Sequence, residues 1–292
     1  MKRARGMMIA SMAIFGTIAL FVRHIPVASG ELALYRAAMA AALIGVFLAA
    51  TKQRIPIFAI RRELPLLLVS GVAMGANWIL LFEAYKYTTV SVATLSYYFA
   101  PTIVTVVSVF LFRERLTGRQ VVCFLMSTLG LAMITGTGDV SPGGSHLTGI
   151  LFGLGAAVLY ASVVLINKFI KDVEGIHRTF LQFLAAAVTL APYVAATGGV
   201  TLGGMDGVGW ACLLTVGVLH TGVTYCMYFS ALRELPGQKA AILSYIDPLV
   251  AVLVSVLLLG EGMTAGQAVG GALILGFTLI NELAPKKTVR GQ

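Results

Sequence analysis

The chain has 292 residues, of which 58% are hydrophobic and only 11% are charged, and its mean hydropathy is +0.91. An average soluble domain is about 25% charged, and a water-soluble globule of this composition would lack the polar residues needed to cover its surface. These proportions argue against a soluble enzyme, a nucleic-acid-binding protein or a disordered scaffold. The net charge of +9 is instead typical of membrane proteins with Lys and Arg in cytoplasmic loops.

Long apolar stretches follow one another along the chain with short connections between them. A helix needs about 20 mostly apolar residues to cross a bilayer core of about 30 Å. The runs are continuous rather than alternating, which favours helices over the strands of a membrane barrel. The sequence therefore predicts an all-α integral membrane protein with ten transmembrane helices. The predicted spans are 7–22, 31–51, 64–84, 90–112, 117–136, 147–170, 177–197, 208–230, 237–259 and 264–284.

The positions of Lys and Arg predict the orientation of these spans. If the N-terminus is cytoplasmic, 18 of the 21 Lys and Arg residues lie in inside segments, Arg23 and Lys86 lie in outside loops, and Arg36 lies within the second span. This is a strong positive-inside bias, and it predicts that both termini face the cytoplasm. The basic residues before the first span, followed by Ala28-Ser29-Gly30, also resemble a cleaved signal peptide. The repeat described next disfavours that alternative, because the first span has a counterpart in the second half.

The second half of the chain repeats the first. Because each half contains an odd number of spans, five, the second copy must cross the membrane in the opposite direction, as in many transporters. We expect the two units to cover residues 1–138 and 146–285, joined by an external Gly/Ser/Pro-rich linker. A shift of 147 residues pairs Gly75 with Gly222, Phe82 with Phe229, Tyr98 with Tyr245, Pro101 with Pro248, Glu114 with Glu261, Thr117 with Thr264, and Gln120 with Gln267.

The two repeated blocks carry a resemblance to a known family. Each block has a mid-helix proline followed by a short apolar run, a glutamate and a turn, and this pattern resembles the EamA-type repeat of the drug/metabolite transporter superfamily. The resemblance covers nearly the whole chain. It implies a carrier of the bacterial inner membrane that exports amino acids or other metabolites, and it says little about the substrate.

The paired prolines and one carboxylate are the strongest candidates for function. Pro101 and Pro248 each remove a helix hydrogen bond, so they are predicted either as hinges beside a central cavity or as packing kinks. Asp247 lies at mid-membrane, where a charged carboxylate costs about 2.5–3.5 kcal/mol on insertion scales. It is predicted to bind a substrate amine or couple transport to protons, or alternatively to serve as a structural partner of exposed carbonyls.

Other polar and aromatic residues fall near the middle of the spans. His220 is predicted to share a helix face with Thr224 and to find a partner in Asp247 or Tyr245, although a structural role is the alternative. Tyr85, Tyr87 and Tyr193 are assigned to the aromatic belts at the membrane surfaces. The remaining aromatic residues suit an amphipathic metabolite. The predicted substrate-binding set is Asn77, Trp78, Tyr97, Tyr98, Tyr160, His220, Thr224, Tyr225, Tyr245 and Asp247.

Three charged residues, Glu31, Arg36 and Glu83, lie toward the outer ends of their predicted helices. They are predicted to form an outer polar network or gate, with ordinary interfacial charges as the alternative. Small-residue spacings such as Gly266-x3-Gly270 allow close helix packing, and the one in the last span also fits a dimer. We therefore expect a monomer or a weak homodimer.

Several motifs are missing from the sequence. It contains no GxxxxGK[ST], HExxH or GxSxG, so neither ATP hydrolysis nor enzyme activity is expected, and no cofactor or metal is predicted. The leading hypothesis is a secondary transporter that exports amino acids, those with aromatic or apolar side chains foremost, by alternating access. A small-molecule substrate and the lipid bilayer are the expected partners. A carrier of nucleotide sugars, drugs or other metabolites is the main alternative, and an integral-membrane enzyme is a weaker one.

Overall fold

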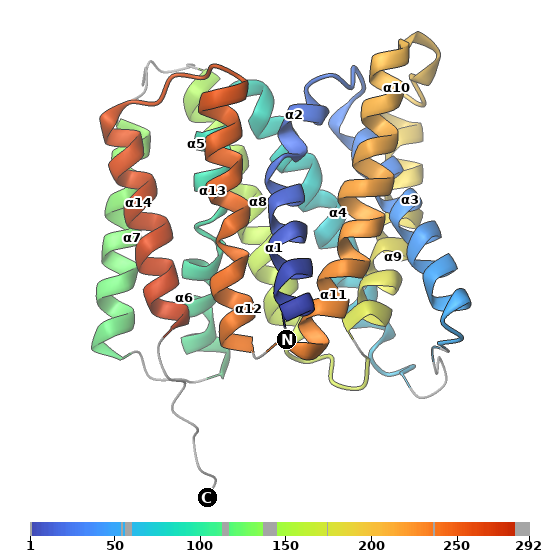
Figure 1. The fold of residues 1–292 in the computed structure, drawn as a ribbon, viewed down its shortest axis with the longest axis horizontal. Coiled ribbons are helices and arrows are strands. Elements are labelled where there is room, and N and C mark those ends of the chain that lie inside the picture. The colour runs from blue at the N-terminus through green and yellow to red at the C-terminus, as the bar shows by residue number, and fades with distance from the viewer. Residues whose placement is uncertain are drawn as a thin grey trace, which may run out of the picture.

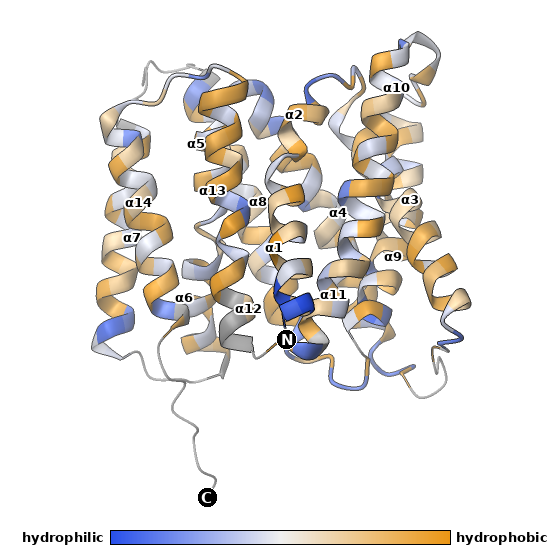
Figure 2. Cartoon of the chain, viewed as in Figure 1, coloured by the Kyte–Doolittle hydropathy of each residue, from blue (hydrophilic) through white to orange (hydrophobic). Residues whose placement is uncertain are grey.

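The computed structural model describes residues 2–53, 55, 60–112, 117–136, 145–173, 175–235 and 237–283. Within these residues all regular structure is helical, with eight helices long and apolar enough to cross a membrane and two shorter apolar ones. Hydrophobic residues run along the helices, and hydrophilic residues gather mainly at the two ends of the bundle (Figure 2). The prediction of an all-α membrane protein with ten spans is confirmed.

Six of the ten spans are single helices, and four are built from consecutive helical segments. The segmented spans are α1–α2, α5–α6, α10–η2–α11 and α12–α13–η3. The elements are α1 (Lys2–Gly16), α2 (Ile18–Val22), α3 (Ser29–Ala50), α4 (Leu64–Tyr87), α5 (Val90–Tyr97), α6 (Ala100–Phe112), α7 (Gly118–Gly136), α8 (Ser145–Asn167), α9 (Gly175–Thr197), the 3-10 turn η1 (Leu202–Gly204), α10 (Gly207–Leu214), the π-helix η2 (Thr215–Val223), α11 (Thr224–Glu234), α12 (Gly237–Ser244), α13 (Ile246–Leu253), the π-helix η3 (Val254–Leu258) and α14 (Ala265–Glu282).

The spans alternate in direction through the bundle. α1 begins and α14 ends at the same end of the molecule (Figure 1), as an even number of crossings requires. The span α5–α6 runs toward the end that holds the start of α1, whereas its repeat-related span α12–α13 runs away from it (Figure 1). The two five-helix repeats are therefore inverted with respect to each other.

A pair of matching helix caps explains why Thr and Gln recur at the same place in both repeats. At the start of α7 the backbone N–H of Thr117 donates to Gln120 Oε1 at 2.8 Å. At the start of α14 the Thr264 N–H donates to Gln267 Oε1 at 3.0 Å, and the Gln267 N–H donates back to Thr264 Oγ1. This reciprocal arrangement is a capping box. Glu114, the repeated glutamate, and the linker residues 137–144 lie outside the described residues.

The two repeats interleave rather than sit side by side. α4 packs against α8 and α9, α1 packs against α11 and α13, and α7 packs against α14. Small residues permit the closest of these contacts: a Cβ atom on Gly130 of α7 would lie 2.5 Å from the carbonyl oxygen of Gly270 of α14. The Gly270 backbone, part of the spacing that also fitted a dimer, is thus used for packing within the chain.

Candidate functional site

The repeated prolines mark two matching breaks near the centre of the bundle. α5 ends at Tyr97 and α6 begins at Ala100, directly before Pro101. α12 ends at Ser244 and α13 begins at Ile246, two residues before Pro248. Proline has no N–H to donate to the preceding turn, so each helix is interrupted beside its proline. The hinge function of these breaks stays a prediction.

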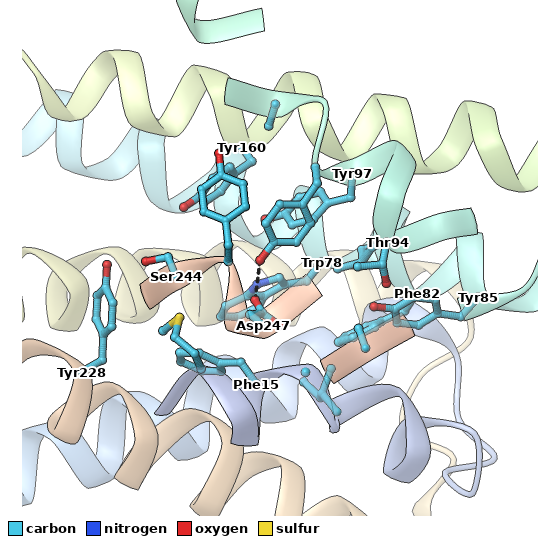
Figure 3. A pocket seen from close by; sticks show the side chains of 18 of the residues that line it. Phe15, Trp78, Phe82, Tyr85, Thr94, Tyr97, Tyr160, Tyr228, Ser244 and Asp247 are labelled. Carbon is cyan, nitrogen blue, oxygen red and sulfur yellow. Dashed lines mark hydrogen bonds between the residues drawn. The ribbon is translucent and has the colours of Figure 1, made fainter. Parts of the chain in front are cut away.

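A cavity of about 350 Å³ lies between the two repeats beside these breaks. Its volume is within the usual range of small-molecule sites, about 300–1,000 Å³. Ten of the 21 lining residues are aromatic. The labelled side chains in Figure 3 reach the wall from α1, α4, α5, α8, α11, α12 and α13. The lining residues are Met12, Phe15, Gly16, Ile18, Arg36, Trp78, Leu81, Phe82, Tyr85, Thr94, Tyr97, Tyr98, Ala100, Pro101, Tyr160, Tyr225, Tyr228, Ser244, Tyr245, Asp247 and Ala251.

Most of the predicted substrate-binding residues come together in this wall, although they are far apart in sequence. Seven of them line the cavity: Trp78, Tyr97, Tyr98, Tyr160, Tyr225, Tyr245 and Asp247. The predicted hinge Pro101 and the predicted gate residue Arg36 also line it. The predicted residues outside this lining are Asn77, His220, Thr224, Pro248, Glu31 and Glu83.

Asp247 joins the two helix breaks. The hydroxyl of Tyr98, at the end of α5, donates a hydrogen bond of 2.6 Å to Asp247 Oδ2 at the start of α13 (dashed line in Figure 3). The bond therefore links the break of the first repeat to the break of the second. Because Ala100 occupies the position equivalent to Asp247 in the first repeat, the cavity holds this carboxylate on one side only.

Arg36 lies in the cavity wall rather than in an outer network, which corrects its predicted position. Its side chain is buried, its Nε donates to Thr221 Oγ1 at 2.9 Å, and its guanidinium carbon lies 4.4 Å from the centre of the Trp78 ring. Phe82 is the next aromatic ring, at 5.8 Å. A cation over the face of an aromatic ring is attracted by the ring quadrupole. These contacts direct Arg36 toward the cavity, which its place in the sequence did not indicate.

Neither His220 nor Thr224 lines the cavity, and the span that carries them contains the π-helix η2. In this segment the hydroxyls of Thr221 and Thr224 donate to carbonyls five residues earlier. Tyr225 lines the cavity, whereas His220 does not. His220 Nε2 lies 3.0 Å from Thr17 Oγ1, and neither Asp247 nor Tyr245, its predicted partners, is in hydrogen-bond contact with it within the described residues. π-Helical turns occur frequently at functional sites.

Asn77 and the two predicted gate glutamates form separate contacts. The Asn77 side chain is buried and donates to the carbonyl oxygen of Ala156 at 2.6 Å, which joins α4 to α8. Glu31 accepts hydrogen bonds from the backbone and the hydroxyl of Thr201. Glu83 pairs instead with Lys86 at 2.8 Å. The predicted single network of Glu31, Arg36 and Glu83 is therefore not present in the described structure.

Some lining residues were missed by the sequence analysis. Tyr85 was assigned to the aromatic belt but lines the cavity together with Phe82 and Thr94. Tyr87 and Tyr193, assigned to the same belt, are 40% and 45% exposed. Tyr85 lies seven residues, or about two helical turns, after Trp78, so the 3.6-residue period places both on one face of α4. That spacing was the available signal.

A polar cluster, exposed at Arg23 and otherwise buried or partly buried, joins the two repeats at the end of the bundle opposite the start of α1. Glu261, in the loop before α14, forms an ion pair with Arg23 and accepts a 2.7 Å hydrogen bond from the N–H of Val90 at the start of α5. Ser255 Oγ donates to Glu261 Oε2 at 2.5 Å and accepts from Ser91 Oγ at 2.6 Å. We call these five residues the Glu261 cluster. It ties the first, fourth and ninth spans together.

Comparison with known proteins identifies the family. The model of the EamA-like transporter family matches residues 3–136 and 147–282. The uncharacterized transporter YxxF of Bacillus subtilis is 29% identical over 91% of this chain and 85% of its own length. The threonine/homoserine exporter RhtA of Escherichia coli is 27% identical over 79% of this chain and 75% of its own. One solved crystal structure shares the fold, with a TM-score of 0.66 at 18% identity over 95% of this chain and 96% of that one. The chain belongs to the EamA-like transporter family of the drug/metabolite transporter superfamily and is a multi-pass membrane transporter.

Proposed function

We propose that this protein is a secondary carrier that exports amino acids, those with apolar or aromatic side chains foremost. The observation that carries the proposal is the aromatic cavity between two inverted repeats, which also contains one cationic and one anionic side chain. Such a wall suits a ligand with an apolar body and a few charged groups. The relative RhtA is named as an exporter of threonine and homoserine, which supports the amino-acid class.

The broken helices and the Glu261 cluster support alternating access. The Tyr98–Asp247 hydrogen bond connects the two breaks at the cavity, so a ligand bound at Asp247 lies where the two repeats meet. The Glu261 cluster holds both repeats together at one end of the bundle. In this proposal it acts as a gate that opens when the repeats rock about the cavity. The repeat units proposed to move run over residues 1–138 and 146–285.

The distribution of basic residues supports an orientation. Arg23 and Lys86 stand at the ends of α2 and α4, whereas Lys2 and Arg119 stand at the starts of α1 and α7 and Lys171 follows α8. α2 and α4 end at the end of the bundle opposite the start of α1, whereas α7 begins and α8 ends at the same end as the start of α1 (Figure 1). Positively charged loops stay in the cytoplasm. We therefore place both termini in the cytoplasm and the Glu261 cluster at the outer side of a bacterial inner membrane.

A flux assay tests the proposed function. Purified protein is reconstituted into proteoliposomes, and uptake of labelled phenylalanine, leucine and threonine is measured with and without a pH gradient. We expect saturable uptake at least about fivefold above protein-free liposomes. If the gradient accelerates uptake by the wild type but not by Asp247→Asn, protons are coupled through that carboxylate, and if it accelerates neither, transport is facilitated diffusion. No flux of any amino acid, beside a working control carrier, would overturn the amino-acid class.

A further inference from the structure

Two side chains of opposite charge face the cavity from opposite repeats, Arg36 from α3 and Asp247 from α13. Neither is in an ion pair with another described residue, since the ion pairs found in that part of the chain are Arg23–Glu261 and Lys86–Glu83. A charge in a low-dielectric cavity is costly unless it is paired. The arrangement therefore favours a ligand that brings one charge of each sign.

Arg36 is oriented to bind a carboxylate. Its Nε is used by the hydrogen bond to Thr221, and its guanidinium carbon lies over the Trp78 ring. The two terminal nitrogens have no hydrogen-bond partner among the described residues. Guanidinium groups bind carboxylates through two parallel N–H···O bonds. The Thr221 and Trp78 contacts hold the guanidinium in place and leave its two terminal nitrogens for such a pair.

Asp247 retains capacity for a cationic donor. Its Oδ2 accepts from the Tyr98 hydroxyl at 2.6 Å, and within the described part of the chain Oδ1 accepts no hydrogen bond. A carboxylate has about four acceptor sites on its two oxygens, so an ammonium group can bind while Tyr98 remains in place. The rings of Tyr97 and Tyr160, with centroids 5.5 Å apart, form the adjoining apolar wall.

We propose that Arg36 and Asp247 form a clamp for the zwitterionic head of an α-amino acid, with the carboxylate on Arg36 and the ammonium on Asp247. The substrate side chain then lies against the aromatic wall. This inference rests on the proposed function and specifies how the same cavity recognises its substrate class. A ligand that has only one of the two head groups leaves the other protein charge unpaired, and the site discriminates against it for that reason.

Three ligands that share one side chain test the clamp: phenylalanine, 2-phenylethylamine, which lacks the carboxylate, and 3-phenylpropanoate, which lacks the amine. Binding to the purified full-length protein is measured by titration calorimetry in detergent. We expect the wild type to bind phenylalanine about 100-fold more tightly than either analogue. Similar affinities for all three ligands would overturn the clamp while leaving amino-acid export in place. Failure to bind any amino acid, with binding of another metabolite class, would instead overturn the proposed function.

Substitutions then assign each head group to its residue. Arg36→Gln should remove the preference for phenylalanine over 2-phenylethylamine. Asp247→Asn should remove the preference for phenylalanine over 3-phenylpropanoate. Equal losses for all three ligands in both variants would show a structural role and contradict the assignment. Arg36→Lys keeps the charge without the planar guanidinium. It should weaken the binding of phenylalanine and of 3-phenylpropanoate about tenfold and leave the binding of 2-phenylethylamine unchanged. This variant replaces Arg36→Gln in the test if Arg36→Gln does not fold.

Matched controls remove similar charges outside the cavity. Lys86→Gln removes an exposed cation, and Asp206→Asn removes a carboxylate that caps α10 while Asn still caps the helix. Both controls should preserve the wild-type order of the three ligands. A change in that order in either control would show that general electrostatics, rather than the clamp, sets the preference.

Discussion

Glu261→Ala is expected to shift the equilibrium between the closed and open states of the Glu261 cluster about 100-fold toward the open state. Glu261 is only 9% exposed and accepts from Arg23, the Val90 N–H and Ser255. Removing one partner of a buried, hydrogen-bonded charge pair costs about 3–5 kcal/mol, and about 1.4 kcal/mol is a factor of ten. Arg23 is 35% exposed, so solvent compensates part of its loss and the lower end of that range applies.

Cysteine labelling measures this shift. Thr94→Cys, in a background without Cys123, Cys212 and Cys226, places one thiol in the cavity wall. A membrane-impermeant maleimide added from the side of the Glu261 cluster should label Glu261→Ala at least about ten times faster than the parent. Lys86→Ala is the control, because its exposed pair with Glu83 contributes only about 0–1 kcal/mol. Equal labelling rates in Glu261→Ala and Lys86→Ala would contradict the gate.

Gly130→Leu is expected to separate α7 from α14 and to destabilise the folded protein. A Cβ at Gly130 would meet the Gly270 carbonyl oxygen at 2.5 Å and Leu273 Cβ at 3.0 Å. Backbone atoms cannot move aside as a flexible side chain can, and overpacking typically costs about 1–3 kcal/mol, occasionally more. We expect a fall in melting temperature of about 5–10 °C, measured by fluorescence-detected size exclusion after heating.

Gly276→Leu is the matched control for this prediction. Gly276 lies on α14, and a Cβ placed there has no neighbour within 4 Å. Both variants exchange Gly for the same good helix former, so the difference between them reports the contact with α7. Melting temperatures that agree within error would show that the Gly130–Gly270 approach is not essential for packing.

The spans could be predicted because each one depends only on its own stretch of sequence, and the repeat could be predicted because the two halves of the sequence can be compared directly. Hydropathy over about 20 residues identifies a span without knowledge of its neighbours. The odd number of spans in each half then requires the inversion. The helix caps at Thr117 and Thr264 explain why Thr and Gln recur in both halves, and the inversion places these caps at opposite ends of the bundle. The helix breaks could also be predicted from the local sequence, because Pro101 and Pro248 remove helix hydrogen bonds whatever the helices pack against.

The partners of the polar residues could not be predicted in the same way. The Tyr98–Asp247 bond joins residues 149 positions apart, and one sequence gives no distance between two spans. His220 contacts Thr17 instead of the predicted Asp247 or Tyr245, a contact between two spans that the sequence of either span does not indicate. The prediction for Arg36 rested only on its position toward one end of its helix. Its contacts with Trp78 and Thr221, which lie on other helices, determine that it faces the cavity.

The central claim is that one cavity between inverted repeats opens to each side of the membrane in turn, and counterflow tests it most directly. Proteoliposomes are loaded with unlabelled phenylalanine and diluted into buffer that contains a trace of labelled phenylalanine. An alternating carrier returns to its outward-facing state mainly with unlabelled substrate bound, releases it, and then carries label inward. The label should therefore accumulate transiently above its equilibrium level in loaded vesicles and not in empty ones. Label that enters loaded and empty vesicles at the same rate, without an overshoot, would contradict the account.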